Sequence, residues 1–330
     1  MNKVKHSVEI LKKLQHKSGL FIAAPATETG YGRAAWIRDN VYEALGLEKT
    51  KQYARVKKAF YAILDILLKH ETKIDWAIKE KPTHKYQYIH PRYCPKTFNE
   101  FWEDWGNKQN DQIGAFLFKF ADLVGKSILE FRDDNDRRIV QKLVFYLESI
   151  EYWKDPDNGI WENEEELHAS SIGACLAGLE RIKKYVHVPQ YLIENGREAL
   201  NQLLPRESIS RETDLALLTL IYPYNIVSSE QKFQILKDIE EKLVREQGVI
   251  RYFDDGYYGS SGKEAEWCFG FPWLAKIYKD LGNKEKYQFY LDKTHEIMVQ
   301  GKIPELYSEG KPNENTPLGW AQAMYLVAVA

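Results

Sequence analysis

Apolar residues recur every three or four positions along most of the chain, which is the pattern of helices that bury one face. The segment 229–245 is a clear example, since Phe233, Leu236, Ile239 and Leu243 follow one another at this spacing. Alternation with a period of two, which would indicate half-buried strands, is scarce, and no strand–helix–strand rhythm is present. The pattern therefore predicts an all-α protein.

The predicted helices are separated by links of very unequal length. They cover residues 4–15, 39–46, 50–69, 108–125, 133–152, 166–183, 189–203, 210–221, 229–245, 264–281, 284–298 and 316–329. Long loops are predicted at 16–38, 70–107, 153–165, 246–263 and 299–315. Helices joined alternately by short and long links suit an (α/α)6 barrel, a toroid of six hairpins with long connections at one rim. An irregular helical array fits the same pattern.

Capping residues mark several of the predicted boundaries. Ser228 and Gln231 have the spacing of a capping box at the start of a helix. Thr316 followed by Pro317 is typical of an N-cap with a first-turn proline. Gly282 is placed to end the helix before it.

Composition narrows the class of protein. We expect the 330 residues to form a single domain, residues 1–330, although two small domains would also fit this length. A net charge of -2 argues against a broad phosphate-binding surface, so no nucleic-acid partner is expected. The three cysteines, Cys94, Cys175 and Cys268, lie too far apart in the sequence for a disulfide scaffold or a Cys-rich zinc module.

Targeting signals are not evident in the sequence. No apolar run reaches the 18 residues that would indicate a transmembrane helix, and we expect no membrane association. The first residues lack the apolar stretch of a signal peptide, so a cytoplasmic location is the expectation.

Aromatic residues are the unusual part of the composition, at 13% with 9 Trp and 21 Tyr. Many of them lie in the predicted long loops, beside Asp, Glu, Arg, Asn and Gln. A ring can pack on the C–H face of a sugar, while polar neighbours pair with its hydroxyl groups. A barrel would gather these loops at one end, which predicts a polar and aromatic pocket suited to a carbohydrate.

Five motifs in or next to these loops resemble glycoside hydrolase family 15, which contains glucoamylases and related exo-acting α-glucosidases. They are Trp36-Ile37-Arg38-Asp39, Trp105-Gly106-x-x-Gln109-x-Asp111, Gly159-Ile160-Trp161-Glu162, Arg251-Tyr252 and Pro304-Glu305-Leu306-Tyr307. Their order and approximate spacing match the family from about residue 18 to the C-terminus. The stretch around Glu162, continued by 166–173, is especially similar to the glucoamylase-like domain of phosphorylase kinase α and β subunits.

The resemblance implies an (α/α)6 barrel that hydrolyses a terminal α-glucosidic bond with inversion and without a cofactor. Glu162 matches the general acid of the family and Glu305 its general base. The implied substrate-binding residues are Trp36, Arg38, Asp39, Trp105, Gln109, Asp111, Trp161, Arg251 and Tyr252. The expected ligand is an α-linked gluco-oligosaccharide, and the expected state is a monomer or weak homo-oligomer.

Two features leave the activity open at this point. Many glucoamylases carry a second acid directly after the general acid, where this chain has Asn163. With no starch-binding module in the sequence, a short soluble oligosaccharide is the expected substrate. The similarity to kinase subunits keeps a second hypothesis open, a non-catalytic carbohydrate-binding or regulatory barrel. A structural helical array without a pocket is a third, and a barrel-type trehalase or an α-linked disaccharide phosphorylase is a variant of the first.

Overall fold

The computed structural model describes residues 2–26, 29–103 and 105–330 and is mostly helical. Those parts of the predicted loops 16–38 and 70–107 that fall on residues 27–28 and 104 lie outside the described residues. The α-helices are α1 Lys3–Leu14, α2 Ile37–Lys49, α3 Tyr53–Lys69, α4 Glu71–Lys79, α5 Asp111–Gly125, α6 Asp134–Ser149, α7 Ala169–Ile182, α8 Gln190–Leu203, α9 Leu218–Ile221, α10 Ser229–Lys242, α11 Gly270–Asp280, α12 Lys284–Glu296 and α13 Gly319–Val329. Two 3₁₀ helices are η1 Lys85–Gln87 and η2 Leu215–Leu217.

Six helices form a closed inner ring, in which α2, α5, α7, α9, α11 and α13 each contact the next and α13 contacts α2 again. Inner helices such as α7 and α13 are buried on nearly every side. Their sequences are apolar or small all round, which is the composition that a helix at the centre of a protein requires. The closed ring distinguishes a barrel from an irregular helical array.

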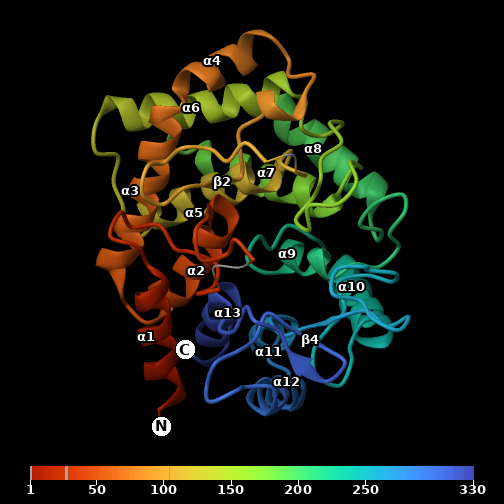
Figure 1. The fold of residues 1–330 in the computed structure, drawn as a ribbon. Helices are drawn as coiled ribbons and strands as arrows, with labels where there is room; N and C mark the ends of the chain where they lie inside the picture. The colour runs from red at the N-terminus through yellow and green to blue at the C-terminus, as the bar shows by residue number, and fades with distance from the viewer. Residues whose placement is uncertain (1, 27–28, 104) are drawn as a thin grey trace.

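Six outer helices alternate with the inner ones along the chain: α1, α3, α6, α8, α10 and α12. Each contacts the inner layer or an outer neighbour, and α1 lies beside α13, which brings the N-terminal and C-terminal helices together (Figure 1). Outer helices bury one face only, as in α10, where Ile235, Leu236 and Ile239 are the buried residues. The all-α, six-hairpin (α/α)6 fold expected from the sequence is confirmed.

Two of the sequence predictions about helices are wrong. Residues 71–79, predicted as loop, form α4, which packs on α6 through Ile74 and Ala77. Only these two residues are buried, so the apolar stripe is too short to show in the sequence. The predicted helix 210–221 contains only η2 and α9, because the Asp214 side chain accepts the backbone N–H of Ala216 and starts the helical turn there.

Other predicted boundaries move by a few residues. The helix predicted at 264–281 begins at Gly270, since Glu266 and Trp267 form strand β3 instead. The helix predicted at 316–329 begins at Gly319, so Thr316 and Pro317 precede it and do not cap it. The capping box at the start of α10 is confirmed, and so is the end of α11 just before Gly282.

Short strands join the loops at the rim of the barrel. The strands are β1 Ala35–Trp36, β2 Arg92–Tyr93, β3 Glu266–Trp267, β4 Leu306–Ser308 and β5 Lys311–Pro312. In the antiparallel pair β1–β2, Trp36 lies opposite Arg92. In the pair β3–β4, Trp267 lies opposite Leu306, next to Glu305 in the chain. These pairings hold loops from distant parts of the sequence against one another.

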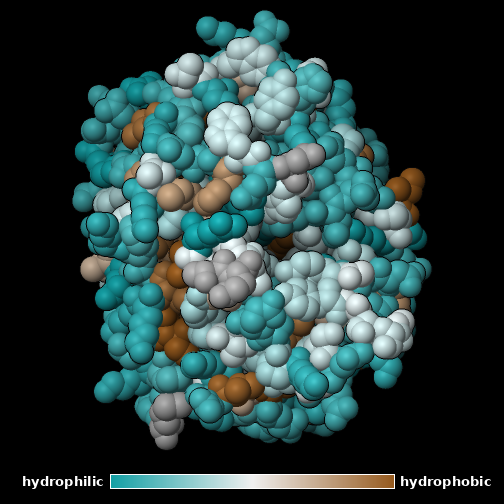
Figure 2. Space-filling model, viewed as in Figure 1, coloured by the Kyte–Doolittle hydropathy of each residue, from teal (hydrophilic) through white to brown (hydrophobic). Residues whose placement is uncertain are grey.

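Long connections lead into the inner helices, and short ones lead out of them. The segments that precede α2, α5, α7, α11 and α13 are long, whereas α2 and α11 are each followed within a few residues by an outer helix. The long segments therefore all meet at the end of the barrel where the inner helices begin. On the face in Figure 2 the surface is mostly hydrophilic, with small separate apolar patches. None of the helices within the described residues is both long and apolar enough to cross a bilayer.

Candidate active site

A cavity of about 450 Å³ opens at the end of the barrel where the inner helices begin, and we call it the central cavity. Its volume is in the range of small-molecule binding sites. Nine of the eleven residues predicted for the site line it: Trp36, Arg38, Asp39, Trp105, Trp161, Glu162, Arg251, Tyr252 and Glu305. They come from the long segments before α5, α7, α11 and α13 and from the start of α2. The topology thus brings together residues that are far apart in the sequence.

Glu162 lies on the loop before α7, with its side chain 25% exposed. Its Oε1 accepts a hydrogen bond from Trp36 Nε1 at 3.0 Å and lies 3.4 Å from the guanidinium of Arg38. Burial raises the pKa of Glu162 to about 7, although the positive charge of Arg38 opposes the shift. A carboxyl group with this pKa still carries its proton at mildly acidic pH, as a general acid must.

Glu305 is on the loop before α13 and is 1% exposed. Its Oε1 accepts a hydrogen bond from the hydroxyl of Tyr31 at 2.9 Å. Its Oε2 accepts from the side-chain amides of Asn313 at 2.6 Å and Asn315 at 2.8 Å. Burial raises the pKa of Glu305, while these three hydrogen bonds favour the ionised form and oppose the rise.

The two glutamates therefore differ in their partners. Glu162 faces one indole N–H and one guanidinium edge, and part of it is open to the cavity. Glu305 is enclosed and accepts three hydrogen bonds from neutral donors. The first arrangement suits a group that gives up a proton, and the second suits a carboxylate that is held in one orientation.

Gln109 and Asp111, the other two predicted residues, contact Arg38 from behind and are not part of the cavity wall. Arg38 Nη1 donates to Gln109 Oε1 at 2.8 Å and lies 3.2 Å from both carboxylate oxygens of Asp111. All three side chains are buried. The pair fixes the guanidinium so that its Nη2 reaches Glu162.

Asp39 follows Arg38 in the first turn of α2 and is half-buried. Burial raises its pKa to about 6, with the charge of Arg38 acting in the opposite direction. Its carboxyl group lines the central cavity, so it is available to hydroxyl groups of a ligand. Asp39 and Arg38 together place one acceptor and one donor set at the beginning of an inner helix.

Arg251 enters the cavity wall from the segment before α11. Its Nε and Nη2 donate to the two carboxylate oxygens of Asp255 at 2.6 and 2.7 Å. Its guanidinium also lies 4.4 Å from the ring centre of Trp267 and 5.4 Å from that of Trp161. An arginine held by a bidentate partner and two rings is a rigid donor, which suits a binding wall.

Stacked aromatic rings close the floor of the cavity. Trp320 stacks on Phe269 with ring centres 5.1 Å apart and on Tyr42 at 4.3 Å. Trp161 packs 5.9 Å from Phe269 and donates its indole N–H to Asp214 at 2.7 Å. Tyr42, which packs beneath Trp320, does not line the cavity and is buried, so the central cavity ends at these rings.

Several residues of the site were not predicted from the sequence. Tyr31, Asn313 and Asn315 hold Glu305, and Arg92 lies 4.3 Å from the ring centre of Trp105. Tyr31 lies in an aromatic loop and could have been found by that signal. No sequence pattern distinguished the two asparagines, because they reach Glu305 only when the chain turns back from β4 into β5.

Metal ligands are not gathered anywhere in the described part of the chain. No group of three or more His, Cys, Asp or Glu side chains there is arranged to hold an ion. The acids of the central cavity are instead paired with Arg, Trp, Tyr and Asn donors. The chemistry that the arrangement itself supports is proton transfer between two carboxyl groups and a bound ligand.

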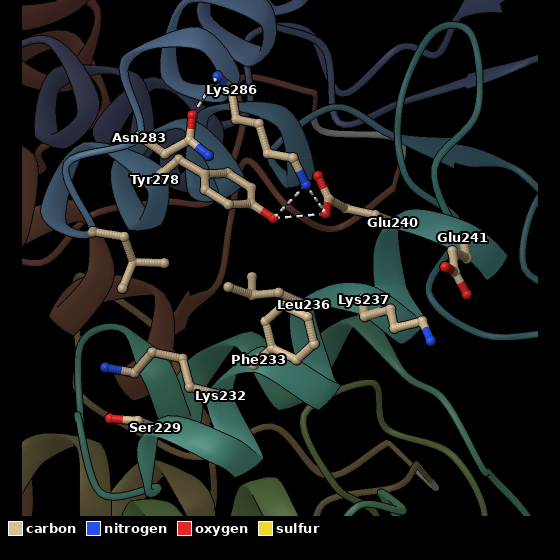
Figure 3. Close-up of a pocket in the computed structure, with 11 residues that line it drawn as sticks. Ser229, Lys232, Phe233, Leu236, Lys237, Glu240, Glu241, Tyr278, Asn283 and Lys286 are labelled. Atoms are coloured by element: carbon tan, nitrogen blue, oxygen red, sulfur yellow. Dashed lines mark hydrogen bonds and ion pairs between the residues drawn. The ribbon is translucent and has the colours of Figure 1, made fainter.

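A second hollow, of about 700 Å³, lies on the outer surface between α10 and the turn from α11 to α12, and we call it the outer groove (Figure 3). Phe233 and Leu281 line it and are 70% and 49% exposed. Glu240 is engaged there by the hydroxyl of Tyr278 at 2.6 Å and by Lys286. None of the residues predicted for the site lies in this groove.

Comparison with known proteins agrees with both the fold and the motifs. The family model described as glycosyl hydrolases family 15 matches residues 1–189. The regulatory subunit alpha of phosphorylase b kinase, skeletal muscle isoform, from Oryctolagus cuniculus is 27% identical over an alignment of 372 positions. The alignment covers 89% of this chain and 30% of that protein. The chain thus spans about 30% of the length of the curated relatives that it matches.

Solved structures show the same fold at low identity. A glycosidase variant in complex with glucose superposes with a TM-score of 0.83 at 19% identity, covering 99% of this chain and 95% of that one. A glucoamylase from Saccharomycopsis fibuligera superposes with a TM-score of 0.70 at 14% identity, covering 99% and 93%. The resemblances inferred from the motifs, to the family and to phosphorylase kinase subunits, are both confirmed.

Proposed function

This chain belongs to glycosyl hydrolases family 15, and on that premise we propose that it is an inverting exo-acting α-glucosidase. It would release glucose from the non-reducing end of short soluble α-linked oligosaccharides. The observation that carries the proposal is that Glu162 and Glu305, 143 positions apart in the sequence, line one cavity. The different environments of the two carboxyl groups support the assignment of Glu162 as the acid and Glu305 as the base.

In the proposed reaction Glu162 gives its proton to the glycosidic oxygen as the C–O bond breaks. Glu305 takes a proton from a water molecule, whose oxygen bonds to the anomeric carbon from the opposite face. Inversion requires roughly 6.5–9.5 Å between the two carboxyl groups to leave room for this water. The pKa of about 7 at Glu162 and the three hydrogen bonds on Glu305 support this division of roles.

Exo action is supported by the closed floor of the central cavity. A cup that ends on Trp320 and Phe269 admits a chain end and leaves no path for an internal stretch of polysaccharide. Arg38 and Asp39 would bind the hydroxyl groups of the terminal glucose. Arg251 and Tyr252 would contact the sugar that leaves, on the side where Asn163 takes the place of a second acid.

A regulatory, sugar-binding barrel is the second candidate, favoured by the similarity to regulatory subunits of phosphorylase b kinase. Such a protein would keep the cavity and bind a sugar without cleaving it. The two readings differ in one measurable property, the release of glucose.

The test is to incubate the purified protein with a panel of α-linked glucose disaccharides and follow the product by proton NMR. We expect β-glucose to appear first and then mutarotate, since inversion of an α-bond gives the β-anomer. Initial α-glucose would contradict inversion, and release of glucose 1-phosphate only with added phosphate would indicate a phosphorylase.

Calorimetry with the same disaccharides completes the test. Binding of maltose or isomaltose without any release of glucose would establish the regulatory reading. If the protein neither binds these disaccharides nor releases glucose from them, both candidate functions are excluded.

A further inference from the structure

The loop that carries Glu162, residues 158–163, has a backbone conformation that its own sequence does not favour. We call it the acid loop. Glu162 has a φ of 63°, in the left-handed region that a side chain with a Cβ rarely adopts. Such a conformation persists only where the surroundings of the residue hold it in place. The neighbour that holds the loop should therefore influence where the carboxyl group of Glu162 lies.

Asn158 is the residue at which the acid loop is closed. Its side-chain Nδ2 donates to the backbone carbonyl oxygen of Asn163 at 2.6 Å. Its backbone carbonyl oxygen accepts a hydrogen bond from the backbone N–H of Asn163 at 2.9 Å. Both ends of the loop are thus tied to each other, with Glu162 held just inside the closure. Asn158 is 8% exposed, so water does not compete strongly for these bonds.

The same side chain ties the acid loop to the segment before α5. Asn158 Oδ1 accepts the N–H of Lys108 at 3.0 Å, and the N–H of Asn158 donates to the Lys108 carbonyl at 2.7 Å. Lys108 immediately precedes Gln109, which orients Arg38. Asn158 therefore sets the register between the loop with the acid and the segment that positions the arginine beside it.

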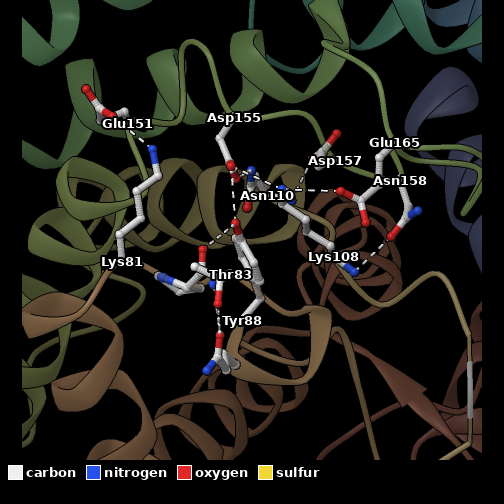
Figure 4. Close-up of polar contacts among 12 residues, drawn as sticks. Lys81, Thr83, Tyr88, Lys108, Asn110, Glu151, Asp155, Asp157, Asn158 and Glu165 are labelled. Atoms are coloured by element: carbon white, nitrogen blue, oxygen red, sulfur yellow. Dashed lines mark hydrogen bonds and ion pairs between the residues drawn. The ribbon is translucent and has the colours of Figure 1, made fainter.

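A buried polar cluster supports this connection (Figure 4). Lys108 Nζ contacts Asp155 Oδ1 at 3.1 Å, and Asn110 donates its side-chain amide to Asp155 at 3.2 Å. The backbone N–H of Asn110 donates to Asp157 at 2.7 Å. Because these groups are buried and paired, the segment around Lys108 is a rigid base against which Asn158 can hold the acid loop.

We propose that Asn158 is a positioning residue that holds Glu162 at the distance from the glycosidic oxygen that proton donation requires. This deepens the proposed function and rests on it. Both groups of the side-chain amide are needed, since the NH₂ group donates to the backbone carbonyl of Asn163 and the oxygen accepts from the backbone N–H of Lys108. An aspartate of nearly the same shape would keep the acceptor but would turn a second acceptor toward the carbonyl of Asn163.

The test compares wild type, Asn158→Asp and Asn158→Ala on maltose and on α-glucosyl fluoride. Fluoride leaves with little help from an acid, whereas the sugar of maltose needs a proton. We expect kcat on maltose to fall roughly 10²-fold, the loss that misplacement of a catalytic group by about 1 Å can cause. On the fluoride we expect a change within about 3-fold, because Glu305 and the water are untouched.

Asn201→Asp on the exposed side of α8 is the matched control, and it should leave both rates unchanged. Equal losses on the two substrates in both Asn158 variants would overturn the proposal, because they would indicate a general structural role. Unchanged rates on maltose would overturn it as well. If Asn158→Asp fails to fold, the uncharged Asn158→Ala carries the comparison.

Failure of the proposed function would be recognised separately, since wild type would then cleave neither substrate. In that case crystal structures of wild type and Asn158→Ala decide the positioning role. We expect Glu162 to leave its positive φ in the variant. An unchanged backbone at Glu162 would overturn the inference.

Discussion

The central cavity and the outer groove show why size alone is a poor guide to function. The outer groove is the larger, at about 700 Å³ against about 450 Å³. Its prominent side chains, Phe233 and Leu281, are exposed and apolar, and its acid Glu240 is engaged by Tyr278 and Lys286. The outer groove therefore combines exposed apolar area with exposed charged side chains, among them Lys237 and a second acid, Glu241.

The central cavity has the opposite character. Its acids are buried or partly buried, and two of them, Glu162 and Asp39, have pKa values raised to about 7 and about 6. Burying charged groups costs free energy, which a protein recovers only by pairing them. Keeping such groups in a cavity that opens to solvent is expected where they act on a ligand.

The largest expected effect comes from removing the two carboxyl groups. Glu162→Gln and Glu305→Gln should each lower kcat on maltose by at least about 10²-fold, because general acid and base catalysis each contribute about that much or more. Sugar binding by calorimetry should persist, since the amide keeps the shape of the side chain. Full turnover in either variant would mean that the carboxyl group it lacks has no catalytic role, and it would contradict the contrast between the central cavity and the outer groove.

The second-largest loss of activity is expected from substitution of Arg38. Arg38→Lys keeps the charge but loses the fork that reaches Gln109, Asp111 and Glu162 together. We expect kcat/KM to fall roughly 10- to 100-fold, equivalent to the 1.5–3 kcal/mol of a hydrogen bond to a charged group. A thermal unfolding curve would separate this from loss of the fold, and an unaltered kcat/KM would contradict the role of Arg38.

A smaller effect is expected on the pH profile. Activity should decline as the pH rises through about 7, because Glu162 loses the proton that it must donate. The hydrogen bond from Trp36 favours ionised Glu162, so Trp36→Phe should raise its pKa and move this decline to higher pH, by on the order of one unit. A decline that moves to lower pH would contradict the assignment of Glu162 as the acid.

The outer groove should give the smallest effect. Phe233→Ser changes a side chain that is 70% exposed, so we expect kcat/KM for maltose to stay within about 2-fold and the free energy of unfolding within about 0.5 kcal/mol. Rate measurements and urea unfolding check both values. A marked loss of glucose release in this variant would show that the groove takes part in the activity.

Much of the fold could be predicted because the inner and outer helices carry different patterns. Helices such as α3 and α10 show their period clearly, and the capping box at Ser228 marks a helix start. The helix α4 was missed because its apolar stripe is only two residues long. The helix predicted at 210–221 was wrong because the Asp214 side chain delays the helix, a local hydrogen bond that periodicity cannot reveal.

The site residues likewise divide into those that the sequence could predict and those that it could not. Nine predicted residues line the central cavity, because their motifs lie at the start of α2 or in the long segments that precede other inner helices. Gln109 and Asp111 belong to the same motif as Trp105 but face Arg38, which depends on how α5 packs against α2. Asn313 and Asn315 became recognisable only through their contacts with Glu305, whereas Tyr31 lies in an aromatic loop that the sequence already showed.

The sequence by itself determined most of the helices, their alternation of short and long links, and the residue types that gather in the loops, because these follow from local periodicity and composition. Only the tertiary structure decided which carboxyl groups are buried, which donors face them, and that Asn158 holds the acid loop in a conformation that Glu162 alone would not adopt. A side chain's environment is set by residues distant in the chain, and closure of the ring is what brings those residues together.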